Sequence, residues 1–211
     1  MDKVTDNEQN NAVESSNAFF EASFARKRVM AILRGLAPEE TVAMCKRAWR
    51  AGIEVVEVPI QSDDALASLQ AAAGAAALEG RTVGAGTVTT LRQLDQALSI
   101  GVSFTVAPGF DPEVARACCD SAVAHLPGVA TASEVQQALR LGFSWLKVFP
   151  AAQLTPGWIR ALLAPFPDAR FVATGGIDGG NARDFLAAGA RVVAVGSALG
   201  DPAQLELLAS V

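Results

Sequence analysis

The sequence predicts a single-domain (β/α)8 barrel, a closed parallel barrel of the TIM type. Three observations favour this fold: a length of 211 residues, eight short runs rich in β-branched residues, and Ala/Leu-rich stretches with helical spacing between those runs. Such barrels commonly fill about 200–250 residues as one domain, and strands that alternate with helices are expected to pair in parallel. The expected strands are Val29–Leu33, Ile53–Pro59, Arg81–Thr87, Val102–Val106, Val123–Pro127, Trp145–Phe149, Arg170–Thr174 and Val192–Val195.

The junctions between the expected elements support the same repeat. Glycine supplies the left-handed residue that stops a helix, and it stands where four helices are expected to end, at Gly52, Gly101, Gly142 and Gly189. Residues typical of helix starts occupy the opposite junctions, at Ala37-Pro38, Ser62-Asp63, Thr89-Thr90, Asp111-Pro112 and Thr131-Ala132-Ser133. A doubly wound sheet is the alternative, but that fold usually carries a glycine motif after its first strand. This chain has only Arg34-Gly35 there.

The two ends of the chain are expected to differ from the repeat. Residues 1–12 are polar and acidic, so we expect a disordered N-terminal extension followed by one barrel domain over residues 13–211. Within that domain, Val13–Arg28 is expected to be an extra helix that closes one end of the barrel. The expected last helix, Pro202–Ser210, is short.

Composition excludes several classes of protein. The net charge is −5 and the longest basic run is Arg26-Lys27-Arg28, whereas nucleic-acid binding needs a sustained positive face. A small anionic substrate is still compatible with this charge. Three cysteines without a CxxC motif predict reduced thiols in the cytoplasm. There is no signal-peptide pattern and no unbroken apolar stretch of about 18–20 residues, so we expect no membrane span.

Lys147 is the first candidate for chemistry, because it is a lone charge in the apolar run Trp145-Leu146-Lys147-Val148-Phe149. In such barrels the active site lies at the carboxyl ends of the strands, and a desolvated lysine there is a nucleophilic amine. The alternative is an outward lysine that snorkels at the rim of the barrel. Polar residues at the same ends are Arg34, Glu57, Gln61, Thr87, Lys147, Thr174 and Ser197.

Glu57 is the second candidate. Strand alternation places it on the same side as Val55 and Pro59. With Lys147 it would form a charge pair in the barrel mouth, a common way to tune a base and an amine. The alternative is a structural ion pair, for example with Arg34.

Two glycine turns are candidates for phosphate binding. Gly175-Gly176 and Gly196-Ser197 follow the seventh and eighth expected strands, where barrels often bind phosphate through backbone N–H groups. Ordinary tight turns are the alternative. His125 is the only histidine, which excludes a multi-histidine zinc site within one chain. The absence of tyrosine leaves acid–base work to a carboxylate or water.

Seven segments, in order along the chain, resemble the bacterial aldolases that cleave 2-keto-3-deoxy-6-phospho-sugar acids, the KDPG/KHG aldolase family. The segments are Ala31-Ile32-Leu33-Arg34-Gly35, Val56-Glu57-Val58-Pro59-Ile60, Gly84-Ala85-Gly86-Thr87-Val88, Ala107-Pro108-Gly109, Pro127-Gly128-Val129-Ala130-Thr131, Lys147-Val148-Phe149-Pro150-Ala151 and Thr174-Gly175-Gly176-Ile177.

The resemblance implies a role for each matching position. Lys147 is where the family forms its Schiff base, and Glu57 is where it has its general acid/base. The resemblance further implies a homotrimer, a small phosphorylated keto acid and pyruvate as ligands, and no metal or other cofactor. Implied substrate contacts are Arg34, Thr87, Pro108 and Thr174, and implied phosphate contacts are Gly175, Gly176, Gly196 and Ser197.

Two positions depart from the gluconate type of the family. That type has arginine four residues after the catalytic glutamate and glutamate two residues after the Phe-Pro of the lysine motif, where this chain has Gln61 and Ala152. The Leu33-Arg34-Gly35 segment and the run from Glu57 to Ser62 look more like the galactonate type. The resemblance therefore implies 2-dehydro-3-deoxy-6-phosphogalactonate as substrate, with the 6-phosphogluconate epimer as the alternative. One rival hypothesis is a phosphosugar isomerase or synthase without covalent lysine chemistry, and another is a non-catalytic trimeric scaffold, which would gain nothing from a costly buried amine.

Overall fold

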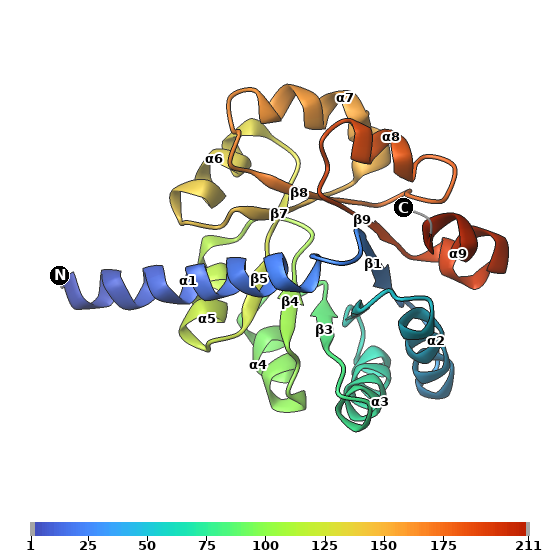
Figure 1. The fold of residues 1–211 in the computed structure, drawn as a ribbon. Coiled ribbons are helices and arrows are strands. Elements are labelled where there is room, and N and C mark those ends of the chain that lie inside the picture. The colour runs from blue at the N-terminus through green and yellow to red at the C-terminus, as the bar shows by residue number, and fades with distance from the viewer. Residues whose placement is uncertain (1–2, 210–211) are drawn as a thin grey trace.

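The computed structural model describes the backbone of residues 3–209 and the side chains of residues 11–196, 199–201, 203–204 and 207–208. It is one domain in which strands and helices alternate (Figure 1). The strands are β1 (Val29–Ile32), β2 (Val55–Pro59), β3 (Val83–Gly86), β4 (Phe104–Val106), β5 (Ala124–Leu126), β6 (Gly128–Val129), β7 (Trp145–Val148), β8 (Arg170–Thr174) and β9 (Val192–Val195). The helices are α1 (Lys3–Ser23), α2 (Pro38–Arg50), α3 (Asp63–Leu78), α4 (Leu91–Ile100), α5 (Pro112–Asp120), α6 (Ala132–Arg140), α7 (Ala151–Leu163), α8 (Ala182–Ala187), the 3-10 turn η1 (Ser197–Gly200) and α9 (Pro202–Ala209).

The strands form a parallel barrel, as predicted. Their order is β5-β4-β3-β2-β1-β9-β8-β7-β6, with every described pair parallel. The predicted fifth strand, Val123–Pro127, corresponds to β5, and a second short strand that was not predicted, β6, follows Pro127. Proline has no N–H to donate, which accounts for the break in the ladder. β5 pairs with β4 and β6 pairs with β7, so the ring of strands is nearly closed through these two short strands.

Side chains alternate between the barrel interior and the helix layer, as expected for strands. One buried cluster fills the interior and includes Met30, Phe104, Trp145 and Val172. A second, larger cluster lies between the strands and the surrounding helices. Lys147 also faces the barrel interior, because it stands two residues after Trp145 on β7. Glu57 faces the interior for the same reason, two residues after Val55 on β2.

The predicted junctions are confirmed. All four glycines expected to stop helices have positive φ, including Gly101 at φ 81° at the end of α4. Thr90 and Asp111 accept backbone N–H bonds at the starts of α4 and α5, and Thr131 with Glu134 forms a capping box at the start of α6. The last helix, α9, ends within one residue of its predicted end.

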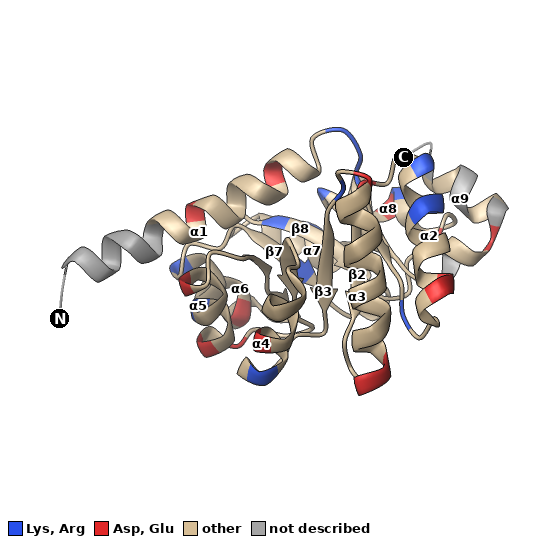
Figure 2. Cartoon of the chain, turned by 90° about the horizontal axis from the view of Figure 1, so that it is seen from below, with Lys and Arg blue, Asp and Glu red and all other residues tan. Residues whose placement is uncertain are grey.

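Helix α1 lies across the N-terminal end of the barrel, as predicted for an extra closing helix (Figures 1 and 2). Its Phe20 and Phe24 are buried against the interior rings of Phe104 and Trp145, with centroid separations of 5.8 Å for Phe20–Phe104 and 5.3 Å for Phe24–Trp145. The helix starts at Lys3, earlier than the expected Val13, and it includes residues 3–12 of the segment expected to be disordered. Disorder of residues 1–12 stays a prediction. Residues 1–2 of this segment lie outside the described residues.

Charged residues of both signs are interspersed over the helices and loops in the view of Figure 2. Within the described part of the chain, no helix is long and apolar enough to cross a membrane. The three cysteines, Cys45, Cys118 and Cys119, are buried and free.

Candidate active site

Lys147 and Glu57 face each other inside the barrel. The Nζ atom of Lys147 lies 3.8 Å from Oε1 of Glu57, a separation typical of an ion pair and longer than a hydrogen bond. Lys147 is 2% exposed and Glu57 is fully buried. The structure therefore excludes the alternative of an outward lysine at the rim, and it brings together the two residues predicted to carry the chemistry.

The Glu57 carboxyl is shielded from solvent and lies near two positive charges. Burial raises the pKa of this carboxyl, and the positive charges of Lys147 and Arg34 offset part of that rise. Neither carboxylate oxygen has a hydrogen-bond partner among the described residues. A buried acceptor without a donor is costly, so this carboxyl is suited to bind a group that the described residues do not supply.

The space for the Glu57 carboxyl comes from Gly86 on the neighbouring strand. The two strands pair with Glu57 opposite Gly84 and Pro59 opposite Gly86. A Cβ on Gly86 would lie 2.9 Å from Oε1 of Glu57 and 3.0 Å from its Cδ. Any other residue at this position would therefore displace the carboxyl.

A cavity of about 460 Å³ opens at the carboxyl ends of β1, β8 and β9. It brings together five of the predicted site residues, namely Arg34, Thr174, Gly175, Gly176 and Gly196. Gly175 and Gly176 both have positive φ, at 96° and 72°, so they form a tight turn that only glycine adopts readily. This turn and Gly196 lie on neighbouring strands, where the sequence predicted a phosphate site.

The other predicted residues whose side chains are described do not line this cavity. Thr87 has a φ of 60°, a rare conformation for a β-branched residue and one that occurs at functional sites. Pro108 packs against Gly128. Gln61 is exposed on the rim and lines separate surface hollows. The side chain of Ser197 lies outside the described residues, although its backbone begins the turn η1.

Sequence reasoning missed several residues that line the cavity. Phe149 lies between the cavity and the pair, because its ring lines the cavity and its centroid is 5.5 Å from Nζ of Lys147. It stands two residues after Lys147, so strand alternation could have identified it. Met44 reaches the cavity from the middle of α2 and Leu36 from the loop before that helix, and no motif signals either residue.

Within the described residues, no three His, Cys, Asp or Glu side chains gather into a metal-binding group. His125, which the sequence left unassigned, is buried on β5, and its Nδ1 lies 2.9 Å from Oγ1 of Thr105. It therefore takes part in packing between β4, β5 and α5 and lies outside the barrel mouth.

A parallel barrel with a buried lysine–carboxylate pair and glycine turns at the carboxyl ends of its strands defines a barrel enzyme. A family model described as KDPG and KHG aldolase matches residues 20–208. The chain belongs to this aldolase family.

Relatives within the family carry different substrate names. A probable 2-dehydro-3-deoxy-6-phosphogalactonate aldolase from Rhizobium meliloti (strain 1021) is 36% identical over 175 residues, which covers 82% of each chain. A 2-dehydro-3-deoxy-phosphogluconate aldolase from Treponema pallidum (strain Nichols) is 36% identical over 190 residues, 88% of this chain and 87% of the relative. A solved KDPG aldolase from Legionella pneumophila, described with pyruvate captured at low pH as a covalent carbinolamine intermediate, has a TM-score of 0.78 at 27% identity and covers 90% of this chain and 94% of that chain.

Proposed function

We propose that this aldolase works through a Schiff base on Lys147, with Glu57 as its general acid and base. The observation that carries the proposal is the buried pair itself, an amine 3.8 Å from a carboxylate in the barrel mouth. The buried carboxyl has no hydrogen-bond donor among the described residues, which leaves it free for a substrate hydroxyl. A related enzyme described with pyruvate captured as a carbinolamine supports the covalent step.

The reaction begins when the Lys147 amine adds to the C2 ketone of a 2-keto-3-deoxy-6-phospho-sugar acid and water leaves. The resulting iminium accepts the electron pair of the C3–C4 bond. Glu57 takes the proton of the C4 hydroxyl as that bond breaks, and glyceraldehyde 3-phosphate leaves. The carboxyl then returns the proton to C3 of the enamine, and water releases pyruvate and the free amine. Covalent catalysis divides one difficult step into easier ones, and the raised pKa of Glu57 suits it to hold a proton between steps.

The cavity is proposed to hold the rest of the substrate. Gly175, Gly176, Gly196 and Ser197 are assigned to the phosphate through backbone N–H groups and the Ser197 hydroxyl. Arg34, Thr87, Pro108 and Thr174 are assigned to the carboxylate and hydroxyl groups. Binding energy from these remote contacts would position the reacting carbon.

We propose 2-dehydro-3-deoxy-6-phosphogalactonate as the preferred substrate over its gluconate epimer. Ala152 supports this choice, because it lies against the phosphate turn: its N–H donates to the carbonyl of Gly175, and a Cβ on Gly176 would be 2.6 Å from the Cβ of Ala152. The gluconate-type glutamate at this position would be a much larger side chain. The Rhizobium meliloti relative carries the galactonate name.

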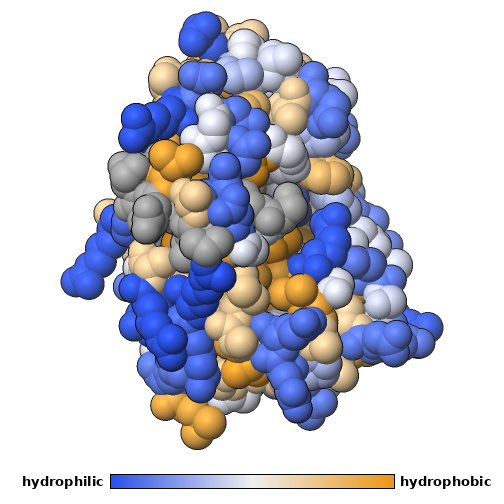
Figure 3. Space-filling model, turned by 90° about the vertical axis from the view of Figure 1, so that its right-hand side faces the viewer, coloured by the Kyte–Doolittle hydropathy of each residue, from blue (hydrophilic) through white to orange (hydrophobic). Residues whose placement is uncertain are grey.

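We further propose a homotrimer that needs no metal and acts in the cytoplasm. Closed symmetric assembly is the usual outcome for soluble oligomers. Hydrophobic residues reach the surface among hydrophilic ones on the face shown in Figure 3, and Leu78 at the end of α3 is 90% exposed. Buried free cysteines support a reducing compartment.

Release of pyruvate from each phosphosugar acid tests the proposed activity. Lys147→Met keeps the length of the side chain and removes the amine, so pyruvate release should fall at least about 10³-fold, since the covalent route is lost. Lys46→Met is the matched control, because the Lys46 side chain is partly exposed and its one ion pair among the described residues is with Glu79, away from the barrel interior. A Lys147→Met enzyme that keeps its rate would refute the Schiff-base mechanism, and a wild type that converts phosphosugars without releasing pyruvate would favour an isomerase or synthase.

A further inference from the structure

Among the described residues, no strand pairing joins β5 to the start of β7, which leaves a seam at the N-terminal end of the barrel. This seam lies between β5 (Ala124–Leu126) and the start of β7 (Trp145-Leu146), because β5 pairs with β4, and β6 pairs only with the second half of β7. Gly128 and Val129 pair with Lys147 and Val148. Main-chain groups at a strand edge need other partners when they are buried.

Helix α1 supplies those partners on the β5 side of the seam. The Ser16 hydroxyl accepts from the N–H of His125 at 2.9 Å and lies 3.3 Å from its carbonyl oxygen, to which it donates. Ser16 is 3% exposed. One side chain therefore bonds both seam-facing main-chain groups of the central residue of β5, as a residue of a neighbouring strand would.

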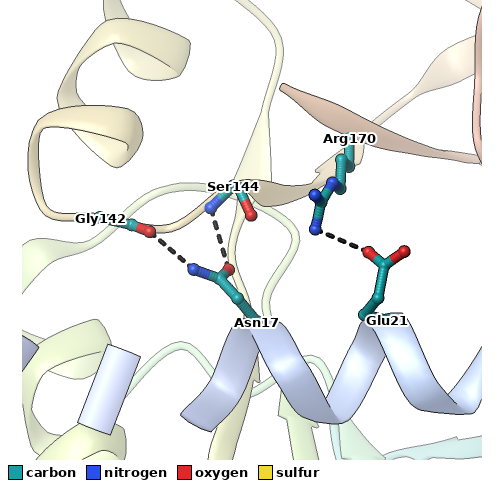
Figure 4. Close-up of polar contacts among 5 residues, drawn as sticks. All are labelled: Asn17, Glu21, Gly142, Ser144 and Arg170. Atoms are coloured by element: carbon teal, nitrogen blue, oxygen red, sulfur yellow. Dashed lines mark hydrogen bonds and ion pairs between the residues drawn. The ribbon is translucent and has the colours of Figure 1, made fainter. Parts of the chain in front are cut away.

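The next residue of α1 does the same on the β7 side (Figure 4). Asn17 Nδ2 donates to the carbonyl of Gly142 at 2.8 Å, and Asn17 Oδ1 accepts from the N–H of Ser144 at 3.0 Å. A side-chain amide has one donor face and one acceptor face, like a peptide group, so Asn17 replaces a missing strand partner. One turn later, Glu21 pairs with Arg170 at 2.6 Å, at the start of β8.

The segment that Asn17 holds, Gly142 to Ser144, leads directly into β7, the strand that carries Lys147. Ser144 precedes Trp145, and Trp145 faces the barrel interior two residues before Lys147. Phe20 and Phe24 of α1 lie against Trp145, at centroid separations of 6.5 Å and 5.3 Å. The position of β7 in the barrel, and with it the position of Nζ relative to Glu57, is set on one side by pairing with β8. On the other side β6 pairs with Lys147 and Val148, and α1 holds the segment that leads into β7.

We propose that Ser16 and Asn17 are positioning residues for Lys147: they join β5 to β7 across the seam and hold the lysine strand so that its amine stays beside Glu57. The inference rests on the proposed Schiff-base function. It assigns α1 a part in the reaction from the end of the barrel opposite the substrate cavity. Loss of these bonds should disturb the covalent step while the cavity contacts remain intact.

The test compares Asn17→Ala and Ser16→Ala with Ser15→Ala. Ser15 is the matched control, because it is exposed and, among the described residues, its hydroxyl donates to the carbonyl of Asn11 within the same helix. The measurements are kcat and KM for pyruvate release, the rate at which borohydride traps pyruvate on Lys147, and thermal melting. We expect Asn17→Ala and Ser16→Ala to lower kcat and the trapping rate by about tenfold, since a 1 Å misplacement can cost about 10²-fold. KM should stay within about twofold, and Ser15→Ala should match the wild type.

A purely structural role predicts a different pattern. If Asn17→Ala melts at a lower temperature but its folded form keeps kcat and the trapping rate within about twofold, the positioning role is refuted. Asn17→Asp keeps the acceptor for Ser144 and puts a carboxylate oxygen in place of the donor to Gly142, so the bond to Gly142 is lost. If Asn17→Ala does not fold, the kcat and trapping rate of folded Asn17→Asp are judged by the same twofold limit. Failure of the wild type to form an adduct on Lys147 would instead refute the proposed function on which this inference rests.

Discussion

Replacing Gly86 with alanine should impair catalysis by moving the Glu57 carboxyl. The added Cβ would lie 2.9 Å from Oε1 of Glu57, while ordinary van der Waals contact begins at 3.4 Å. The carboxyl must therefore move by about 0.5 Å. Since a 1 Å misplacement can cost about 10²-fold, half that distance corresponds to about tenfold, or about 1.4 kcal/mol of activation free energy.

The assay is pyruvate release, followed as kcat and KM for Gly86→Ala and for Gly84→Ala. Gly84 is the matched control, because it is the other inward glycine of β3 and its added Cβ would clash with the ring of Phe104. Gly84→Ala should lower the free energy of unfolding by about 1–3 kcal/mol through overpacking, with kcat of the folded enzyme little changed. A Gly86→Ala enzyme whose kcat stays within about twofold of the wild type would show that the position of the Glu57 carboxyl does not limit the reaction.

Two further predictions follow from the buried titratable groups. Glu57→Gln should keep part of the imine formation with pyruvate while slowing cleavage by about 10²–10⁴-fold, since it removes the proton acceptor and leaves the amine; a variant that cleaves at the wild-type rate would exclude Glu57 as the base. Burial lowers the pKa of His125 to about 4 from its ordinary 6.5. Between these two pH values, His125 binds a proton in the unfolded chain but not in the folded chain. The free energy of unfolding should therefore fall as pH drops from about 6.5 to about 4, by on the order of 3 kcal/mol, and urea denaturation at several pH values should show a flatter dependence for His125→Gln; equal slopes for both proteins would contradict the assignment.

The fold was predictable because its signals are local. Each strand is a short apolar run, and each junction has a residue with a defined backbone role, such as Thr131 starting α6 and Gly101 ending α4. The break between β5 and β6 falls at Pro127, but a single proline at the end of a run does not reveal whether pairing stops or changes partner.

The proposed catalytic pair could also be predicted from local signals. Lys147 and Glu57 are the single charges of β7 and β2, strands that a barrel buries on both faces. The sequence therefore marked both as unusual, and the structure then excluded the outward alternative for Lys147. Their mutual distance depends on barrel closure and could not be read from the chain. The role of Gly86 is a contact between neighbouring strands that requires their register.

The contributions of helices were the least predictable. Met44 lines the cavity from α2, and Asn17 fastens β7 from α1, more than a hundred residues away in the chain. Both contacts depend on how a helix packs against the barrel. In the sequence, Ser16 and Asn17 stand in a polar segment, and nothing in that segment distinguishes them from residues on a solvent-exposed helix face.

The most direct test of the account is to incubate the protein with pyruvate and borohydride and to map the adduct by mass spectrometry. The chain has only four lysines, Lys3, Lys27, Lys46 and Lys147, so each is distinguishable. The account predicts a single adduct on Lys147. No adduct, or an adduct spread over the other three lysines, would contradict the covalent mechanism.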